Sequence, residues 1–199
     1  MKILFATNNA HKLAEVQAVL GDSYTLVTPR DCGVTEEIPE TQPTLEGNAL
    51  QKARYLYERT GLDCFADDTG LEVEALGGAP GVHSARYGGE AYKSDRARLE
   101  LLLRNMEEKE NRKAHFVSVI TLLLPDGRKI VARGECPGQI LFAPKGTGGF
   151  GYDPVFYLPE LEKTYAELAP EEKNAISHRA RALQAFCRIY REEFEHDDK

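Results

Sequence analysis

Hydrophobic positions along the first fifty residues change between two periods, one typical of buried strands and one typical of amphipathic helices. Residues 2–6 are a short, mainly apolar run that predicts a strand. Leu13, Val16 and Leu20 then recur at helical spacing and stop at Gly21, which predicts a helix. Asn9 is a good N-cap for that helix, so we expect the first free amide donors to follow it.

The next segments continue the alternation of strand and helix. Residues 24–28 read as a second strand, and residues 33–43 as an acidic loop rich in Glu and Pro. A helix is expected from about Thr44 to Arg59, with Thr44 as its cap. Its inward face is formed by Leu45, Ala49, Lys52, Ala53 and Leu56. Most of the acids in this region, Glu36, Glu37, Glu40 and Glu46, are expected to be solvated, with a further role for one of them.

The second half of the chain combines a strand, two helices and a hairpin. Residues 71–76 alternate as a strand does and end in the Gly-rich stretch 77–81. Ser94 is expected to cap a helix whose inward residues are Leu99, Leu102, Leu103 and Met106. Ser177 is expected to cap the last helix, with an apolar face of Ala180, Leu183, Cys187, Tyr190 and Phe194.

Residues 116–124 and 130–136 read as a hairpin around Pro125-Asp126-Gly127, since Asp-Gly is a strong turn signal. The first of these strands is apolar on both faces, so we expect it in the middle of a covered sheet. A hairpin means that the sheet is not wholly parallel, while the strand and helix order of the first half indicates an α/β fold.

Composition fits a single soluble domain, which we expect to span residues 1–199 with two lobes. The chain has 199 residues, 42% of them apolar and 29% charged. A net charge of -7 argues against a protein that coats nucleic acid. The four cysteines are widely spaced, which predicts reduced thiols rather than zinc or a disulfide framework. The N-terminal apolar run is too short for a signal or a spanning segment, so we expect a cytoplasmic protein without a membrane partner.

Two adjacent carboxylates are the centre of the candidate chemistry. Asp67 and Asp68 follow an apolar run and precede Thr69 and Gly70. These residue types are typical of a turn. If the stretch continues as a strand instead, the two side chains point to opposite faces, and one face could hold a metal or water while the other anchors a loop.

Basic residues occur in the first turns of two predicted helices, where a cation opposes the helix dipole. They are Lys12 near the N-terminus and His178 with Arg179 in the last helix. A phosphate or another electron-rich group opposite them would explain this, whereas Lys12 could also be an ordinary surface lysine. The Gly-rich segment 146–153 either presents Phe150 or Tyr152 to a ligand ring or is a flexible connector.

Together these segments resemble one family, the Ham1-like pyrophosphatases of inosine triphosphate and other non-standard purine nucleoside triphosphates. Each motif alone is weak, but their order and spacing are highly specific. The motifs are Thr7-x-Asn9-x-x-Lys12, Ala66–Leu71, Leu76–Gly81, Ser84–Tyr87, Gly146–Asp153, Glu171-Glu172-Lys173 and Ile176–Arg179.

The resemblance implies Mg²⁺-dependent hydrolysis of a nucleoside triphosphate to the monophosphate and pyrophosphate. It implies that Asp68 is the general base and a metal ligand, with Glu40 as the second ligand. Glu46 competes for that second role, because relatives commonly read Glu-Asn-Ala where this chain has Gly47-Asn48-Ala49. The implied substrate contacts are Thr7, Asn8, Asn9, Ala10, His11, Lys12, Lys52, Thr69, Phe150, Gly151, Tyr152, Asp153, Lys173, His178 and Arg179.

The family's fold implies a long, curved, mixed β-sheet flanked by helices, with two lobes, a central cleft for the nucleotide and a homodimer. The expected substrates are ITP, dITP and XTP, since donors such as His178 and Arg179 match the C6 carbonyl of hypoxanthine and xanthine and reject the amino group of adenine. The alternatives are a pyrophosphatase for another modified nucleotide, such as a pyrimidine triphosphate, and a nucleotide sensor without turnover. A haloacid-dehalogenase-type phosphatase is disfavoured, because it needs Asp-x-Asp-x-Thr.

Overall fold

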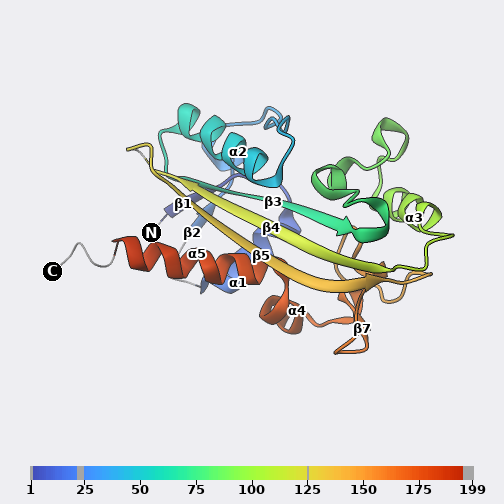
Figure 1. Cartoon of the computed structure of the whole chain (residues 1–199). Helices are drawn as coiled ribbons and strands as arrows, with labels where there is room; N and C mark the ends of the chain where they lie inside the picture. The colour runs from blue at the N-terminus through green and yellow to red at the C-terminus, as the bar shows by residue number, and fades with distance from the viewer. Residues whose placement is uncertain (1, 22–24, 125, 195–199) are drawn as a thin grey trace. The chain divides into compact units, whose positions relative to one another are not determined.

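The computed structural model describes residues 2–21, 25–124 and 126–194. Within these ranges seven strands form one sheet in the order β2-β1-β3-β4-β5-β6-β7 (Figure 1). The strand β1 (Lys2–Phe5) pairs in parallel with β2 (Thr25–Val27) and with β3 (Cys64–Val73). The strand β6 (Phe156–Leu158) pairs antiparallel with β5 (Lys129–Ile140) and β7 (Lys163–Thr164). The predicted α/β class with a mixed sheet is confirmed.

The described chain divides into two compact units. The first is built from residues 1–68, 118–134 and 178–199, and the second from residues 69–117 and 135–177. The strands β3, β4 (Lys113–Leu123) and β5 each continue from one unit into the other. Whether the whole chain acts as one domain around a central cleft stays a prediction.

In the first unit, helices cover both faces of the sheet (Figure 1). The helices α1 (Ala10–Leu20) and α5 (His178–Phe194) pack on one face, in a core that contains Val16, Phe65 and Leu183. The helix α2 (Leu45–Thr60) covers the other face through Ala53 and Leu56. Because successive side chains of a strand point in opposite directions, neighbouring strand residues contribute alternately to the two cores.

The predicted starts of α1 and α2 are confirmed, because they depend on local hydrogen bonds. The Asn9 carboxamide oxygen accepts from the amides of His11 and Lys12, and the Thr44 hydroxyl accepts from the amide of Gly47. The strand predicted over residues 24–28 is observed as β2, and Tyr24 lies outside the described residues.

The second unit has its own core, formed around Leu71, Leu102, Phe116, Phe156 and Tyr165. Its helices are α3 (Asp95–Asn105), capped by Ser94 as predicted, and the short α4 (Pro170–Ile176). The strand predicted over residues 71–76 is wrong at its end, because β3 stops at Val73 and a 3₁₀ turn covers Glu74–Leu76. The backbone of Val73 bonds there to the amide of Gly78 and the carbonyl of Ala79, which fold the chain back at once.

The predicted hairpin is formed by β4 and β5. The amide of Leu124 donates to the Arg128 carbonyl, and the amide of Gly127 donates to the Leu124 carbonyl. Pro125 of the predicted turn lies outside the described residues. As expected, β4 is the middle strand of the sheet order and is buried along nearly its whole length. The expectation of reduced cysteines agrees with the structure, in which all four are described and none is in a disulfide.

None of the helices in the described part of the chain combines the length and the apolar composition that crossing a lipid bilayer requires.

Candidate active site

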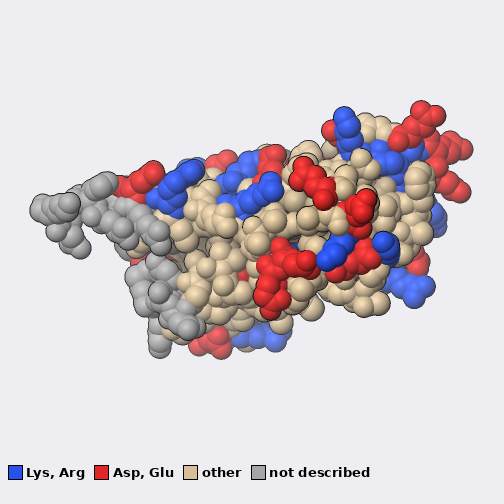
Figure 2. Space-filling model, turned by 90° about the horizontal axis from the view of Figure 1, so that it is seen from below, with Lys and Arg blue, Asp and Glu red and all other residues tan. Residues whose placement is uncertain are grey.

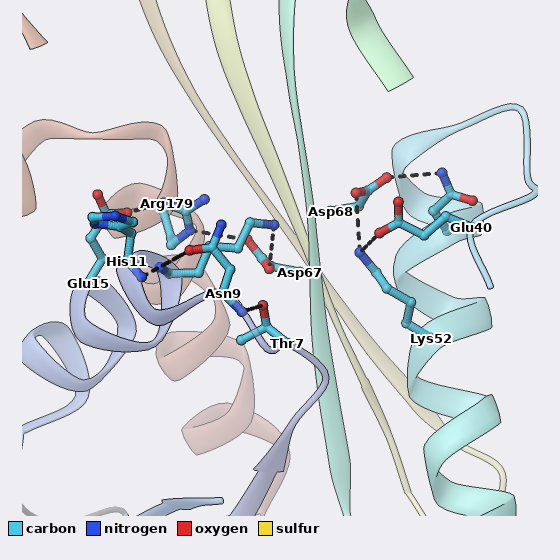
Figure 3. Close-up of polar contacts among 11 residues, drawn as sticks. Thr7, Asn9, His11, Glu15, Glu40, Lys52, Asp67, Asp68 and Arg179 are labelled. Carbon is cyan, nitrogen blue, oxygen red and sulfur yellow. Dashed lines mark hydrogen bonds and ion pairs between the residues drawn. The ribbon is translucent and has the colours of Figure 1, made fainter. Parts of the chain in front are cut away.

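Asp67 and Asp68 lie within β3, so the turn interpretation of this stretch is wrong. Their carboxylates leave the strand on opposite sides (Figure 3). The last strand pair between β1 and β3 is Phe5 with Phe65, and the amide of Ala6 still donates to the Phe65 carbonyl at 2.9 Å. The two acids therefore lie just beyond the carboxyl end of β1. The place of β3 in the sheet, with β4 hydrogen-bonded on its other side, extends it through residues whose local preference favours a turn.

The order of the first strands makes this end of β1 a favourable place for a ligand. From β1 the chain runs through α1 to β2 on one side, and from β2 it runs through α2 to β3 on the other side of β1. All three strands are parallel, so their carboxyl ends lie at one edge, and the strand order changes direction between β1 and β3. Open α/β sheets bind ligands at such a switch point.

On the α1 and α5 side of β3, Asp67 holds two cations. Lys12 Nζ donates to Asp67 Oδ1 at 3.0 Å, and Arg179 Nε donates to Asp67 Oδ2 at 3.1 Å (Figure 3). Arg179 also forms an ion pair with Glu15 of α1. Lys12 is thus not a free surface lysine. Carboxylates of the protein itself balance the charges of Lys12 and Arg179, which the sequence alone leaves unexplained.

The protonation state of Asp67 follows from these neighbours. Its side chain is only 1% exposed, and burial by itself would raise the pKa of the carboxyl group. The positive charges of Lys12, Arg179 and Lys52 outweigh burial and hold the pKa of Asp67 well below its usual range. Burial lowers the pKa of Lys12, although Asp67 opposes this change.

On the α2 side of β3, one lysine joins two acids. Lys52 Nζ lies 2.6 Å from Glu40 Oε1 and 3.3 Å from Asp68 Oδ1 (Figure 3). Lys52 reaches both acids because it lies on the buried face of α2. Glu46, the competing acid, is exposed at the first turn of α2 and pairs with Lys129 at 3.4 Å. The structure therefore brings Glu40, and not Glu46, to the lysine that Asp68 also contacts.

Burial raises the pKa of Asp68, and the charges of Lys52 and Lys12 oppose this rise only in part. The pKa of Lys52 is raised, because Asp68 and Glu40 outweigh the opposite effect of its burial. Adjacent acids on one strand thus have pKa values shifted in opposite directions, a pattern that is frequent at functional sites.

The segment from Thr7 to Lys12 covers the loop after β1 and the first residues of α1. The Thr7 hydroxyl is buried and accepts from the Asn9 amide at 3.1 Å, whereas Asn8, Ala10 and His11 are exposed. The expectation of free amide donors after Asn9 is corrected for two of them, because the His11 and Lys12 amides already donate to the Asn9 side chain.

In the second unit, the Gly-rich segment 146–153 is organised around Asp153. Its carboxylate accepts from Lys173 Nζ at 2.7 Å and from the Phe150 amide at 2.9 Å. Lys173, 6% exposed, also lies 5.0 Å from the centre of the Phe150 ring. A Cβ at Gly149 would lie 2.0 Å from Asp153 Oδ2, so glycine is needed for this close approach.

The ring of Tyr152 lies in the core of the second unit, and its hydroxyl donates to the Ser84 carbonyl at 2.8 Å. Of the two aromatic side chains considered for a ligand ring, the half-buried Phe150 is therefore the more accessible. Gly151 is also held in place, since its amide donates to Asp95 of α3 at 2.9 Å. Thr69 is half-buried on β3.

The first unit brings Lys12 and Arg179 to Asp67 on one side of β3, and Lys52 and Glu40 to Asp68 on the other side, from segments far apart in the sequence. The second unit brings together Phe150, Gly151, Asp153 and Lys173. His178 is buried at the start of α5, next to Arg179.

Sequence reasoning overlooked Glu15 and Asn48 and left open whether Asp67 ligates a metal or supports a loop. A signal was present for the first two, because Glu15 lies three residues after Lys12 and Asn48 four residues before Lys52 on the same helix faces.

The residues on the α2 side fit a divalent cation. Glu40 and Asp68 already share one ammonium group, so they lie close enough to share a metal ion. No set of three or more Cys, His, Asp or Glu side chains suited to a metal occurs among the described residues. Two carboxylates suit Mg²⁺, which keeps several waters and takes further oxygens from substrate phosphates.

Comparison with known proteins shows to which family the chain belongs. The family model described as the Ham1 family matches residues 3–189. A dITP/XTP pyrophosphatase of Flavobacterium johnsoniae is 48% identical over 184 residues, which cover 92% of this chain and 95% of the relative. A dITP/XTP pyrophosphatase of Thermus thermophilus is 48% identical over 195 residues, which cover 96% of this chain and 93% of the relative. The Staphylococcus aureus Ham1 structure aligns with a TM-score of 0.87 at 38% identity, over 97% of this chain and 100% of that one. The chain belongs to the Ham1 family.

Proposed function

We propose that this protein is a Mg²⁺-dependent pyrophosphatase that hydrolyses dITP, ITP and XTP to the monophosphate and pyrophosphate. Relatives nearly half identical over almost the whole chain carry the name dITP/XTP pyrophosphatase, which supports the substrate class. The observation that carries the chemistry is that Glu40 and Asp68 share the Lys52 ammonium group at the carboxyl end of β1.

The residues of the first unit supply what attack on a charged phosphorus requires. Bound between Glu40 and Asp68, Mg²⁺ would neutralise phosphate oxygens and provide an aligned water. Asp68 orients the attacking water as the general base. Lys12 and Lys52 balance the remaining phosphate charge, and the segment from Thr7 to Lys12 contacts the phosphates. Asp67 keeps Lys12 and Arg179 charged and in place through its two ion pairs.

Selection of the base needs donors that face a C6 carbonyl. We assign this role to His178 and Arg179, with Phe150, Gly151, Tyr152, Asp153 and Lys173 as further contacts to the base and sugar and Thr69 as a substrate contact. A site built from donors rejects adenine because its C6 amino group would leave buried donors without acceptors, which disfavours ATP by roughly 10⁴ to 10⁵.

The proposed setting is that of a cytoplasmic homodimer that acts on free nucleotides and not on nucleic acid. The acidic composition supports the last point. On the face shown in Figure 2, Lys and Arg side chains alternate with Asp and Glu. Light scattering coupled to gel filtration tests the dimer, since a mass of one chain at micromolar concentration would contradict it.

Pyrophosphate release from dITP, ITP, XTP, dTTP and ATP, each with Mg²⁺, tests the activity. We expect turnover of the first three well above that of dTTP and ATP. Faster turnover of dTTP would favour the alternative of a modified-pyrimidine pyrophosphatase, and release of orthophosphate would contradict cleavage between the α and β phosphorus atoms.

Asp68→Asn separates the enzyme from the alternative of a nucleotide sensor. The substitution keeps the shape of the side chain but removes the base and a metal ligand, so turnover should fall by at least about 10². Calorimetric binding of an inosine triphosphate with a methylene bridge between the α and β phosphorus atoms should remain measurable. A variant with full turnover would contradict the role of Asp68, and equal loss of turnover and binding would indicate a structural role instead.

A further inference from the structure

A buried amide links Asp68 to the segment that carries Glu40. Asn48 of α2 is 0% exposed. Its Oδ1 accepts from the Gln42 amide at 2.8 Å, and its Nδ2 donates to Asp68 Oδ2 at 3.2 Å. The side chain thus joins the segment that carries Glu40 to the acid on β3.

These two bonds fix which way the Asn48 amide points. A backbone N–H can only donate, so the atom that faces Gln42 must be the carbonyl oxygen, and the NH₂ group must face Asp68. Asp68 Oδ1 lies near Lys52 and Asp68 Oδ2 receives the Asn48 bond, so both carboxylate oxygens are held in place. A reversed amide would place two oxygens against each other at Asp68.

The same amide holds the Glu40 segment against α2. Glu40 is two residues before Gln42, and Thr41 between them exchanges two hydrogen bonds of 2.9 Å with the Gln51 side chain. Gly47 permits this close approach, because a Cβ there would lie 2.8 Å from the Cβ of Gln42. Gln51 therefore supports the segment without a bond to either acid, whereas Asn48 bonds to the segment and to Asp68.

We propose that Asn48 is a positioning residue that sets the separation and orientation of Glu40 and Asp68. This inference rests on the proposed function for its kinetic readout. Hydrogen bonds to a carboxylate are stronger than those between neutral groups, so Asn48 constrains Asp68 more firmly than Gln51 constrains the loop. Asn48→Ala removes this link, and Asn48→Asp keeps the shape but replaces the donor with a charge that repels Asp68.

The test compares Asn48→Ala and Asn48→Asp with the control Gln51→Ala, which loosens the same segment but leaves the bond to Asp68. We measure pyrophosphate release from dITP as a function of Mg²⁺ and substrate concentration, together with the thermal midpoint of each protein. The Asn48 variants should lose about 10- to 100-fold in kcat, as expected for loss of a hydrogen bond to a charged group, and need more Mg²⁺ for half-maximal rate. The KM for dITP should change much less, and Gln51→Ala should lose only a small fraction of kcat.

Crystal structures of the variants provide a readout that does not depend on turnover. In Asn48→Ala we expect the Asp68 carboxylate and residues 40–42 to move, and in Gln51→Ala we expect Asp68 to stay in place. Unchanged positions of both acids in Asn48→Ala, or a kcat and Mg²⁺ requirement equal to those of the wild type, would overturn the inference. If the wild-type protein hydrolyses none of the triphosphates, the proposed function fails, and these structures still decide the role of Asn48.

Discussion

At the scale of single residues, the most informative feature is that two adjacent acids have different neighbours. Asp67 lies between two cations and Asp68 beside one lysine that Glu40 also contacts. Local sequence cannot distinguish them, because both are the same residue type in the same strand. Because successive side chains of a strand point to opposite faces, the two acids face different helices and therefore have different charged neighbours.

Asp67→Asn should destabilise the protein by about 3–5 kcal/mol at pH 7, since Lys12 and Arg179 would remain buried without their shared carboxylate. The pKa of Asp67 is lowered by folding, so its contribution is fully present above the unfolded value of about 3.9 and is lost as the pH falls toward the folded value. The difference in free energy of unfolding between wild type and variant should therefore become smaller below about pH 4. Urea unfolding across pH 3–7 measures this, with the exposed Asp126→Asn as a control. A gap that does not change with pH would contradict the explanation.

At the scale of elements, α5 approaches β5 so closely that only glycine fits at one position. A Cβ on Gly134 would lie 2.2 Å from the Ala182 amide nitrogen and 2.2 Å from the His178 carbonyl oxygen. Both contacts are to backbone atoms, which have no side-chain freedom to give way. Gly134 therefore determines where the first turn of α5, and with it Arg179, lies against the sheet of the first unit.

Gly134→Ala should force α5 away from β5. The free energy of unfolding should fall by about 1–3 kcal/mol or more, the usual range for overpacking. Because Arg179 follows His178 on the displaced turn, turnover of dITP should fall as well. Thermal unfolding and pyrophosphate release measure the two effects. Arg133→Ala, at the neighbouring exposed position of β5, should affect both far less. Wild-type stability of Gly134→Ala would show that the helix adapts without cost.

At the scale of the whole molecule, the strands β3, β4 and β5 run without interruption through both compact units. Each unit has cores of its own, with Leu56 in the first and Leu102 in the second. Because three central strands are covalently continuous through both units, we expect both cores to unfold in one cooperative transition.

Leu56→Ala and Leu102→Ala should each reduce the free energy of unfolding by about 2–5 kcal/mol, the range typical of a leucine removed from a core, and should each shift one common thermal midpoint to lower temperature. Both side chains are fully buried, so the two variants are matched. Differential scanning calorimetry measures the number of transitions. Two resolved transitions, of which each substitution shifts only one, would contradict a single cooperative unit.

The sequence by itself determined where α1, α2 and α3 begin and where the hairpin turns, because the N-caps Asn9, Thr44 and Ser94 and the turn at Asp126-Gly127 act over a few residues. It also contained the motifs that identify the family. The tertiary structure alone decided that Asp67 and Asp68 belong to a strand, that Asp67 holds Lys12 and Arg179, and that Glu40 rather than Glu46 contacts Lys52. These outcomes depend on the place of β3 between β1 and β4 in the sheet and on ion pairs between residues up to 112 positions apart, which no local preference encodes.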